Sequence, residues 1–131
     1  MPTLPLNLIG TYAHVRDDAG MRAIPADGDF WQALGEGRFP ELDQGRLLSA
    51  FEFAEAWSSW ERHPAGEELV LLLAGACDLL LELEQGLQRI HLEQIGDYIL
   101  IPKGIWHTAH TDRPTRLLFL TPGLGTEHRP V

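Results

Sequence analysis

Apolar and polar residues alternate over short runs along most of this chain, and the runs have the length of β-strands. Eight of them follow residue 45, at 46–53, 56–63, 68–74, 77–83, 87–92, 97–101, 107–111 and 116–121. In the second run the alternation puts Trp57, Ser59, Glu61 and His63 on one face. Glycines and prolines separate the runs. The pattern predicts an all-β barrel or jelly roll.

The first third of the chain is less regular and predicts a strand near residues 6–14 and one short helix near residues 30–34. Asp27 or Asp29 can accept backbone N–H bonds at the start of this helix, and Gly35 or Gly37 can end it. With 131 residues and 14.7 kDa the chain fits one hydrophobic core. We therefore expect one domain over residues 1–131, made of an N-terminal strand and helix arm (1–45), a barrel (46–121) and a C-terminal tail (122–131).

Composition and charge narrow the class of protein. Hydrophobic residues make up 44% of the chain and charged residues 22%, as in folded globular domains. The formal net charge of −9 and the pI near 5.0 oppose binding to nucleic acid and to anionic membrane surfaces. The longest apolar stretch, residues 69–77, is too short to cross a bilayer, and the first residues lack a signal-peptide pattern, so a cytoplasmic location is expected. Cys77, the only cysteine, is expected to be buried in a strand.

Two groups of residues with fixed spacing carry the candidate chemistry. In the first group His63 is followed after four residues by Glu68 and after six more by Gly75. The second group begins after 20 intervening residues and consists of Gly96, Pro102, Gly104 and His107. These spacings resemble the two conserved motifs of the cupin superfamily. The strings WERHPAGEE, PKGIWH and TPGLGTEHRP also resemble a subgroup of small bacterial cupins that are mostly uncharacterised.

The resemblance implies a cupin fold, a double-stranded β-helix or jelly-roll barrel, and a metal site formed by Glu61, His63, Glu68 and His107. Cupins with a well-formed metal centre usually have His-x-His in the first motif, and here Glu61 occupies the first of these positions. Glutamate is a competent ligand, so the site is either kept with more negative charge or degenerate. Two imidazoles and two carboxylates form a mixed nitrogen and oxygen site, suited to Mn²⁺, Fe²⁺, Ni²⁺ or Zn²⁺.

An arrangement without metal is the alternative. Glu61 and Glu68 would then pair with Arg62, with Arg116 or with each other through a shared proton, and the two histidines would hydrogen-bond inside a cavity.

The remaining polar and aromatic residues are expected outside the metal site, in the pocket wall, on the surface or in the C-terminal tail. Trp57 and Ser59, on the inward face, are predicted to line the pocket, whereas Trp60 and Trp106 are expected outside or at an interface. His110 lies an odd number of residues after His107 and should face away from it. His128 can fold back over the barrel mouth, although a terminal tail is more often docked or mobile.

Three functions remain open at this point. The first is a metal-dependent enzyme, an oxygenase, isomerase or lyase acting on a small organic substrate. The second is a non-catalytic module that binds or senses a small molecule with a degenerate metal site. A structural or storage barrel ranks last, because inward polar groups are costly without a ligand. A homodimer is expected, with the apolar segment 4–15 adding a strand to the sheet of a neighbouring copy.

Overall fold

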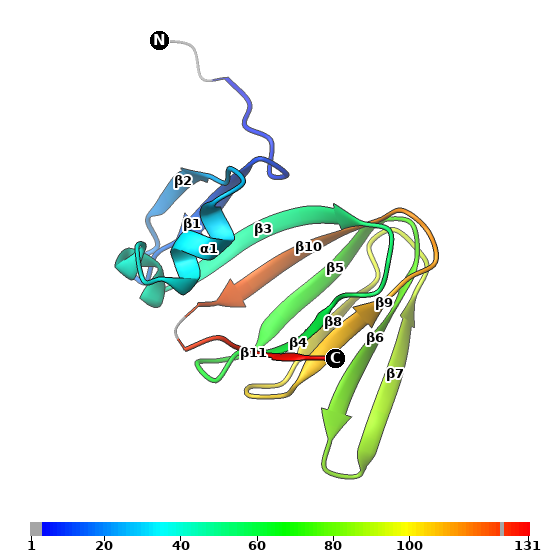
Figure 1. The fold of residues 1–131 in the computed structure, drawn as a ribbon. Helices are drawn as coiled ribbons and strands as arrows, with labels where there is room; N and C mark the ends of the chain where they lie inside the picture. The colour runs from blue at the N-terminus through cyan, green and yellow to red at the C-terminus, as the bar shows by residue number, and fades with distance from the viewer. Residues whose placement is uncertain (1–3, 124) are drawn as a thin grey trace.

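Two antiparallel β-sheets face each other in the computed structural model, which describes residues 4–123 and 125–131 (Figure 1). The larger sheet has the strand order β2-β1-β3-β10-β5-β8, and the smaller has the order β11-β4-β9-β6-β7. Within the described residues the elements are β1 (Thr11–Val15), β2 (Met21–Pro25), α1 (Phe30–Gly35), the 3₁₀ helix η1 (Pro40–Asp43), β3 (Arg46–Phe53), β4 (Ser59–Arg62), β5 (Glu68–Ala74), β6 (Cys77–Leu83), β7 (Gly86–Leu92), β8 (Tyr98–Ile101), β9 (His107–His110), β10 (Thr115–Pro122) and β11 (Glu127–Pro130). The predicted all-β fold with one short helix is confirmed.

The main hydrophobic core fills the space between the two sheets. Val70 and Leu72 of β5, Leu79 of β6 and Leu117 of β10 have no exposed surface. Side chains two residues apart on a strand share a face, so the face of β5 that buries Val70 and Leu72 also carries Glu68 at the start of the strand. The core therefore ends in a buried carboxylate where β5 begins.

A second, smaller core joins the N-terminal elements to the larger sheet. Tyr12, Ile24, Phe30, Leu42 and Leu47 form this cluster, which brings α1 and η1 against β1, β2 and β3. The helix predicted at residues 30–34 is confirmed, and at its start Asp27 Oδ1 accepts a hydrogen bond from the backbone N–H of Asp29 at 3.1 Å. The side chain of Asp29 makes no capping bond, and the backbone N–H of Phe30 donates instead to the carbonyl oxygen of Asp27 at 3.0 Å.

The position of β1 contradicts the expected route to a dimer. β1 pairs with β2 on one side and with β3 on the other, so residues 11–15 have both edges occupied within their own sheet. A strand with two paired edges cannot add to the sheet of a neighbour. The expectation of strand addition by this segment is therefore wrong for residues 11–15.

The C-terminal segment and the lengths of the helices complete the description of the fold. The predicted C-terminal tail contains a strand, β11, which pairs with β4 along its whole length. No helix within the described residues is long and apolar enough to span a membrane.

The turn between β5 and β6 requires a glycine. Gly75 has a φ of +79°, and a Cβ atom placed there would lie 2.3 Å from the carbonyl oxygen of Pro114. Both the left-handed backbone and this close approach exclude a side chain. The turn holds β5 and β6, in opposite sheets, at a fixed separation.

Candidate metal centre

Three strands bring the four predicted site residues together. Glu61 lies in β4 directly opposite His107, the first residue of β9, although the two are 46 residues apart in the chain. His63 directly follows β4, and Glu68 begins β5 in the opposite sheet. Gly104, with a φ of +76°, makes the turn before His107, and its backbone N–H donates to the carbonyl oxygen of His63 at 3.1 Å. This bond ties the second motif to the first.

One donor atom from each of the four side chains lies within 4.8 Å of the other three. His107 Nε2 is 3.0 Å from Glu68 Oε1 and 3.3 Å from Glu61 Oε1. His63 Nε2 is 3.2 Å from Glu68 Oε2 and 3.6 Å from Glu61 Oε1. The side chains of His107, Glu68 and His63 are 0%, 2% and 5% exposed, whereas that of Glu61 is 22% exposed. The cluster is thus buried on three sides and reaches solvent through Glu61.

Outer hydrogen bonds set the orientation of both imidazole rings. His107 Nδ1 lies 3.1 Å from the carbonyl oxygen of Ile105, which can only accept, so this nitrogen carries the proton. His63 Nδ1 lies 2.9 Å from Thr126 Oγ1, and the Thr126 hydroxyl donates to the carbonyl oxygen of Gly123 at 3.2 Å. His63 Nδ1 is therefore also the donor. When the two rings are neutral, the lone pair is therefore on Nε2, the atom that faces the cluster, as metal ligation requires.

Both carboxylates are held from outside in the same way. The Thr121 hydroxyl donates to Glu68 Oε2 at 2.6 Å. His128 Nε2 of β11 lies 3.3 Å from Glu61 Oε2, the oxygen that does not face the two inward histidines. Three of the four outer contacts thus come from Thr121, Thr126 and His128. The register of β11 explains the last of them, because His128 is paired directly with Glu61.

Two buried polar atoms of the cluster lack a hydrogen bond. They are His63 Nε2 and Glu68 Oε1. Each lies within 3.2 Å of an oppositely charged group, but the approach does not have hydrogen-bond geometry. A buried polar atom without a partner is costly. The donor set therefore fits a cation placed between the four side chains, which would satisfy both atoms at once.

Opposite charges shift the pKa values of all four groups. Burial alone would lower the pKa of His63, but Glu61 and Glu68 outweigh it and raise the pKa to about 9. The same balance raises the pKa of His107 to about 10. Burial would raise the pKa of Glu61, but His107, His128 and His63 hold it well below its usual range. The pKa of Glu68 is likewise lowered, because contacts with both inward histidines outweigh its burial.

The arginines expected in an arrangement without metal lie elsewhere. Arg62 pairs with Glu127 at 3.0 Å, and Arg116 pairs with Glu52 on the outer side of the sheet. That part of the alternative is wrong, since neither arginine is paired with Glu61 or Glu68 in the described residues. The buried histidines are the partners of both carboxylates.

The other sequence-predicted residues lie around the cluster or away from it. Trp57 packs among Phe51, Phe53 and Phe119 at the edge of the core, and Ser59 accepts a hydrogen bond from Thr108 through its carbonyl oxygen. Their role as pocket walls stays a prediction. The guanidinium of Arg129 lies 4.5 Å from the centre of the Trp106 ring and 5.3 Å from that of Trp60.

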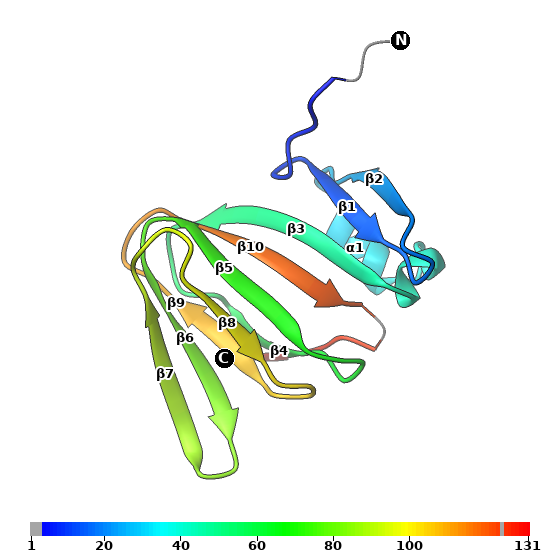
Figure 2. The same ribbon diagram turned by 180° about the vertical axis from the view of Figure 1, so that it is seen from behind.

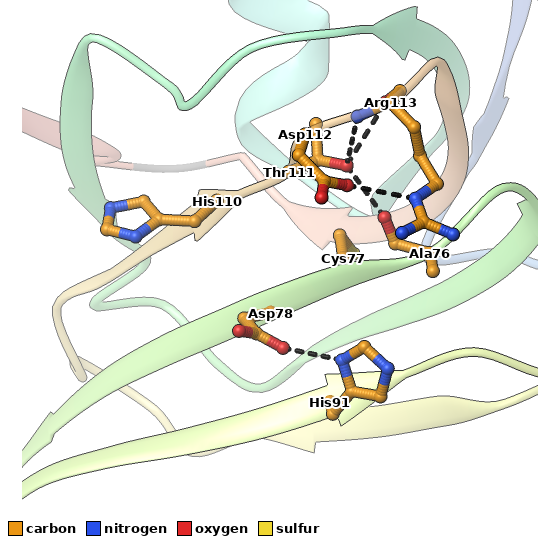
Figure 3. A pocket seen from close by; sticks show the side chains of 8 residues that line it. All are labelled: Ala76, Cys77, Asp78, His91, His110, Thr111, Asp112 and Arg113. Atoms are coloured by element: carbon orange, nitrogen blue, oxygen red, sulfur yellow. Dashed lines mark hydrogen bonds and ion pairs between the residues drawn. The ribbon is translucent and has the colours of Figure 1, made fainter.

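His110 lies outside the cluster. It lines a separate surface cavity of about 340 Å³ together with Cys77, Asp78 and His91 (Figure 3). His91 is turned toward Asp78, with Nδ1 and Oδ1 2.6 Å apart, and His110 is turned away from both. Cys77 is 3% exposed, and burial raises the pKa of its thiol to about 11.

Two site residues, Thr121 and Thr126, were not predicted from the sequence. Thr121 follows Leu117 and Phe119 at a spacing of two, which is a signal for an inward polar side chain at the end of an apolar strand. Thr126 has no such signal, because it lies in a loop and its contact with His63 spans 63 residues.

Comparisons with known proteins agree on the fold. No protein-family model and no curated protein matches the chain. Oxalate decarboxylase from Bacillus subtilis matches 66% of this chain over 23% of its own length, with a TM-score of 0.51 and 15% identity. A structure of oxalate oxidase matches 62% of this chain over 44% of its own length, with a TM-score of 0.52 and 14% identity.

A cupin-2 domain protein from Shewanella frigidimarina matches 64% of this chain and 71% of its own, with a TM-score of 0.48 and 19% identity. What these structures share with the chain is the fold, two facing antiparallel sheets. The chain has the cupin fold, as its two motifs predict.

Proposed function

We propose that Glu61, His63, Glu68 and His107 bind one divalent transition-metal ion and that the loaded protein is an enzyme acting on a small organic substrate. The observation that carries this proposal is the pair of buried atoms, His63 Nε2 and Glu68 Oε1, that face the other donors without a hydrogen bond. When bound, the metal would supply a Lewis acid or an oxygen-activating centre, as in an oxygenase, isomerase or lyase. Mn²⁺, Fe²⁺, Ni²⁺ and Zn²⁺ all suit this donor set.

The protein side chains have distinct parts in this proposal. The two inward histidines and Glu68 are fixed by outer hydrogen bonds and almost fully buried, so they serve as the rigid part of the site. Glu61 is the most exposed member of the cluster, which makes it the group that a substrate would meet. Its carboxylate can therefore also hold or accept a proton from the substrate.

The charge of the site bears on the class of substrate. Two carboxylates and one divalent cation give a formally neutral centre. A dianion such as oxalate, which two of the matched proteins are named for, gains less Coulomb energy at a neutral centre than at a positive one. We therefore propose a neutral or weakly charged organic substrate.

A non-catalytic binding module is the second candidate, and the position of β11 beside the exposed member of the cluster favours it. β11 runs alongside β4 and places His128 against Glu61, the one exposed member of the cluster. Two surface cavities, near Asp78 and near Tyr12, are lined by other residues. In this reading the cluster would hold an ion that orders a ligand site without turnover.

Metal content measured on the purified protein tests the first proposal. We expect about one transition-metal ion per chain in the wild type, and severe loss in His63→Ala and His107→Ala, because the remaining donors cannot replace a ligand. His110→Ala, a histidine of the same strand as His107 but outside the cluster, is the matched control and should retain the metal. Equal loading of the wild type and His107→Ala would refute the site. A stoichiometric metal without turnover of any substrate would favour the binding module.

A further inference from the structure

The C-terminal strand β11 contacts the candidate metal centre from the edge of its sheet. Its only partner strand within the described residues is β4, and Figure 2 shows the chain passing from the end of β10 in the larger sheet to the side of β4 in the smaller one. None of the four residues of β11 is buried, and none belongs to either hydrophobic core. A short edge strand without buried apolar side chains has little stability of its own. Contacts other than core packing must therefore hold β11 in place.

The side chains of β11 face alternately outward and toward the cluster. His128 is paired with Glu61 and faces it, with His128 Nε2 3.3 Å from Glu61 Oε2. The residues on either side, Glu127 and Arg129, therefore point to the outer face of the sheet. A shift of the pairing by one residue would turn one of these two side chains toward Glu61 and remove His128 from it. The outer contact of Glu61 thus depends on the register of a strand that has no apolar pattern to fix that register.

Two arginines and two tryptophans on the outer face supply contacts that depend on this register. We call them the arginine–tryptophan cluster: Arg62, Arg129, Trp60 and Trp106. The Arg129 guanidinium lies over the rings of both Trp60, its paired residue on β4, and Trp106. The Arg62 guanidinium lies 4.7 Å from the centre of the same Trp106 ring. A guanidinium over an aromatic face is attracted by the ring, so Arg129 gains most when it is opposite Trp60.

Each guanidinium of the cluster also has a carboxylate partner. Arg62 pairs with Glu127, the residue of β11 directly opposite it, at 3.0 Å. Arg129 pairs with Glu82 of β6, whose backbone N–H donates to the carbonyl oxygen of Trp106 at 2.9 Å. Trp106 directly precedes His107 in the chain. The cluster therefore joins β11 to β4, to β6 and to the segment that carries His107.

We propose that Arg129 is a positioning residue of the metal centre and that it acts through β11. Its contacts fix the register that keeps His128 on Glu61. They also hold Thr126, directly before β11, with its Oγ1 atom 2.9 Å from His63 Nδ1. Outer contacts of this kind orient metal ligands, so a loosened β11 would leave two proposed ligands less well oriented. The inference rests on the proposed function, because it concerns the ligands of that metal ion.

Titration of Mn²⁺ into the metal-free protein with matched arginine variants tests this inference. Arg116→Ala is the control, because the side chain of Arg116 is 44% exposed and pairs with Glu52 on the larger sheet, whereas that of Arg129 is 37% exposed. We expect Arg129→Ala to weaken Mn²⁺ binding at least about threefold and Arg116→Ala to leave it unchanged. Arg129→Lys keeps the charge but stacks less well on the rings, so its affinity should be intermediate. Equal affinities for the wild type and Arg129→Ala would overturn the inference.

A second comparison separates positioning from a general loss of stability. In the double variant Thr126→Ala/His128→Ala neither side chain contacts a proposed ligand, so adding Arg129→Ala should change Mn²⁺ affinity by less than about twofold. A residue that only stabilises the fold would cause the same loss in this background as in the wild type. That result would also overturn the inference.

Amide hydrogen exchange in β11 measures how firmly the strand is held without any metal. Arg129→Ala should speed this exchange by about fivefold, since it removes a cation–π contact and an ion pair, and Arg116→Ala should not. Unchanged exchange in Arg129→Ala, together with Mn²⁺ binding by the wild type, would overturn this inference alone. A wild type that binds no Mn²⁺ would overturn the proposed function and this inference with it. Circular dichroism of each variant separates these effects from loss of the fold.

Discussion

Glu61 differs from the other three residues of the cluster because its two carboxylate oxygens contact different groups. Its Oε1 atom faces His63 and His107, and its Oε2 atom faces His128. Of the four candidate ligands it alone keeps an appreciable exposed surface, 22% of its side chain. A change at this residue therefore alters the charge of the centre and its border with solvent at the same time.

Two substitutions at Glu61 separate charge from shape. Glu61→Gln keeps an oxygen acceptor but removes one negative charge, so metal affinity should fall clearly, by about tenfold or more. Glu61→His keeps a ligand and should retain the metal, while making the centre a stronger Lewis acid. Calorimetric titration of metal into the metal-free proteins measures the metal affinity of both variants. Equal affinities for the wild type and Glu61→Gln would remove Glu61 from the ligand set.

His128 is expected to position Glu61 without binding the metal itself. Removing its contact in His128→Ala frees Oε2, so the carboxylate loses its orientation and metal affinity should fall by roughly threefold to tenfold. His91→Ala is a suitable control, because His91 is similarly exposed and pairs with a carboxylate, Asp78, outside the cluster. His128→Gln, which can still donate to Oε2, should recover part of the loss in the same titration. If His91→Ala and His128→Ala weaken binding equally, the contact has no positioning role.

At the scale of elements, the period of apolar residues was sufficient to predict the bounds of the strands that contact the core. β3, β5 and β6 have the bounds predicted from the sequence, since each places alternate apolar side chains between the sheets. β2 and β11 were not predicted. β2 buries one residue, Ile24, and the only apolar side chain of β11 is Pro130 at its end, so neither strand has a recognisable apolar period. Backbone pairing to a neighbouring strand alone defines them.

The site, too, could be predicted only where its residues have a local sequence signal. The two motifs predicted the four members of the cluster, because their spacing reflects strand alternation and the turn at Gly104. The outer contacts from Thr126 and His128 depend on the pairing of β11 with β4, a long-range contact without a local signal. Of the two carboxylates expected at the start of the short helix, Asp27 accepts a backbone N–H bond, whereas Asp29 makes no capping bond because the Asp27 carbonyl oxygen already accepts from the N–H of Phe30.

A comparison of two glycine substitutions tests how much unfolding free energy depends on the close approach of backbone atoms in the β5–β6 turn. Gly75 and Gly37 have nearly equal φ values, +79° and +76°, but only Gly75 has atoms where a Cβ would lie. Gly37→Ala should cost about 1 kcal/mol of unfolding free energy for the left-handed backbone alone. Gly75→Ala should cost about 3 kcal/mol or more, because the Pro114 carbonyl group must also move. Denaturant unfolding of both variants measures the difference, and equal losses would show that the close approach at Gly75 relaxes freely.

At the scale of the whole molecule, the proposed metal ion would compete with protons for the same cluster. In the metal-free protein the raised pKa values of His63 and His107 keep both rings charged at neutral pH, and their ion pairs stabilise the fold. This stabilisation is complete below the unfolded-state histidine pKa of about 6.5 and is lost as pH rises through about 9 to 10. Metal binding needs neutral imidazoles, so it must release these protons.

Metal affinity should therefore rise with pH. Two displaced protons give an increase of up to about a hundredfold per pH unit. The shift of the unfolding midpoint caused by metal should be small near pH 6.5 and larger near pH 8.5, and the midpoint of the metal-free protein should fall over the same range. Thermal unfolding with and without metal across this range measures both. A metal-induced shift independent of pH would contradict the assignment of both histidines as ligands.

The separation of 46 positions between Glu61 and His107 has a consequence for how the protein would acquire the proposed metal ion. In the unfolded chain the four candidate ligands are far apart, and closing loops of this length has an entropic cost that a metal ion would have to meet before any cage exists. Metal therefore cannot nucleate folding here, as it does in small zinc-folded domains, and the barrel must form first. Under the proposed function a preformed site would select its ion from those available around it, so expression in media of different metal content should yield the same fold with different metal ions bound.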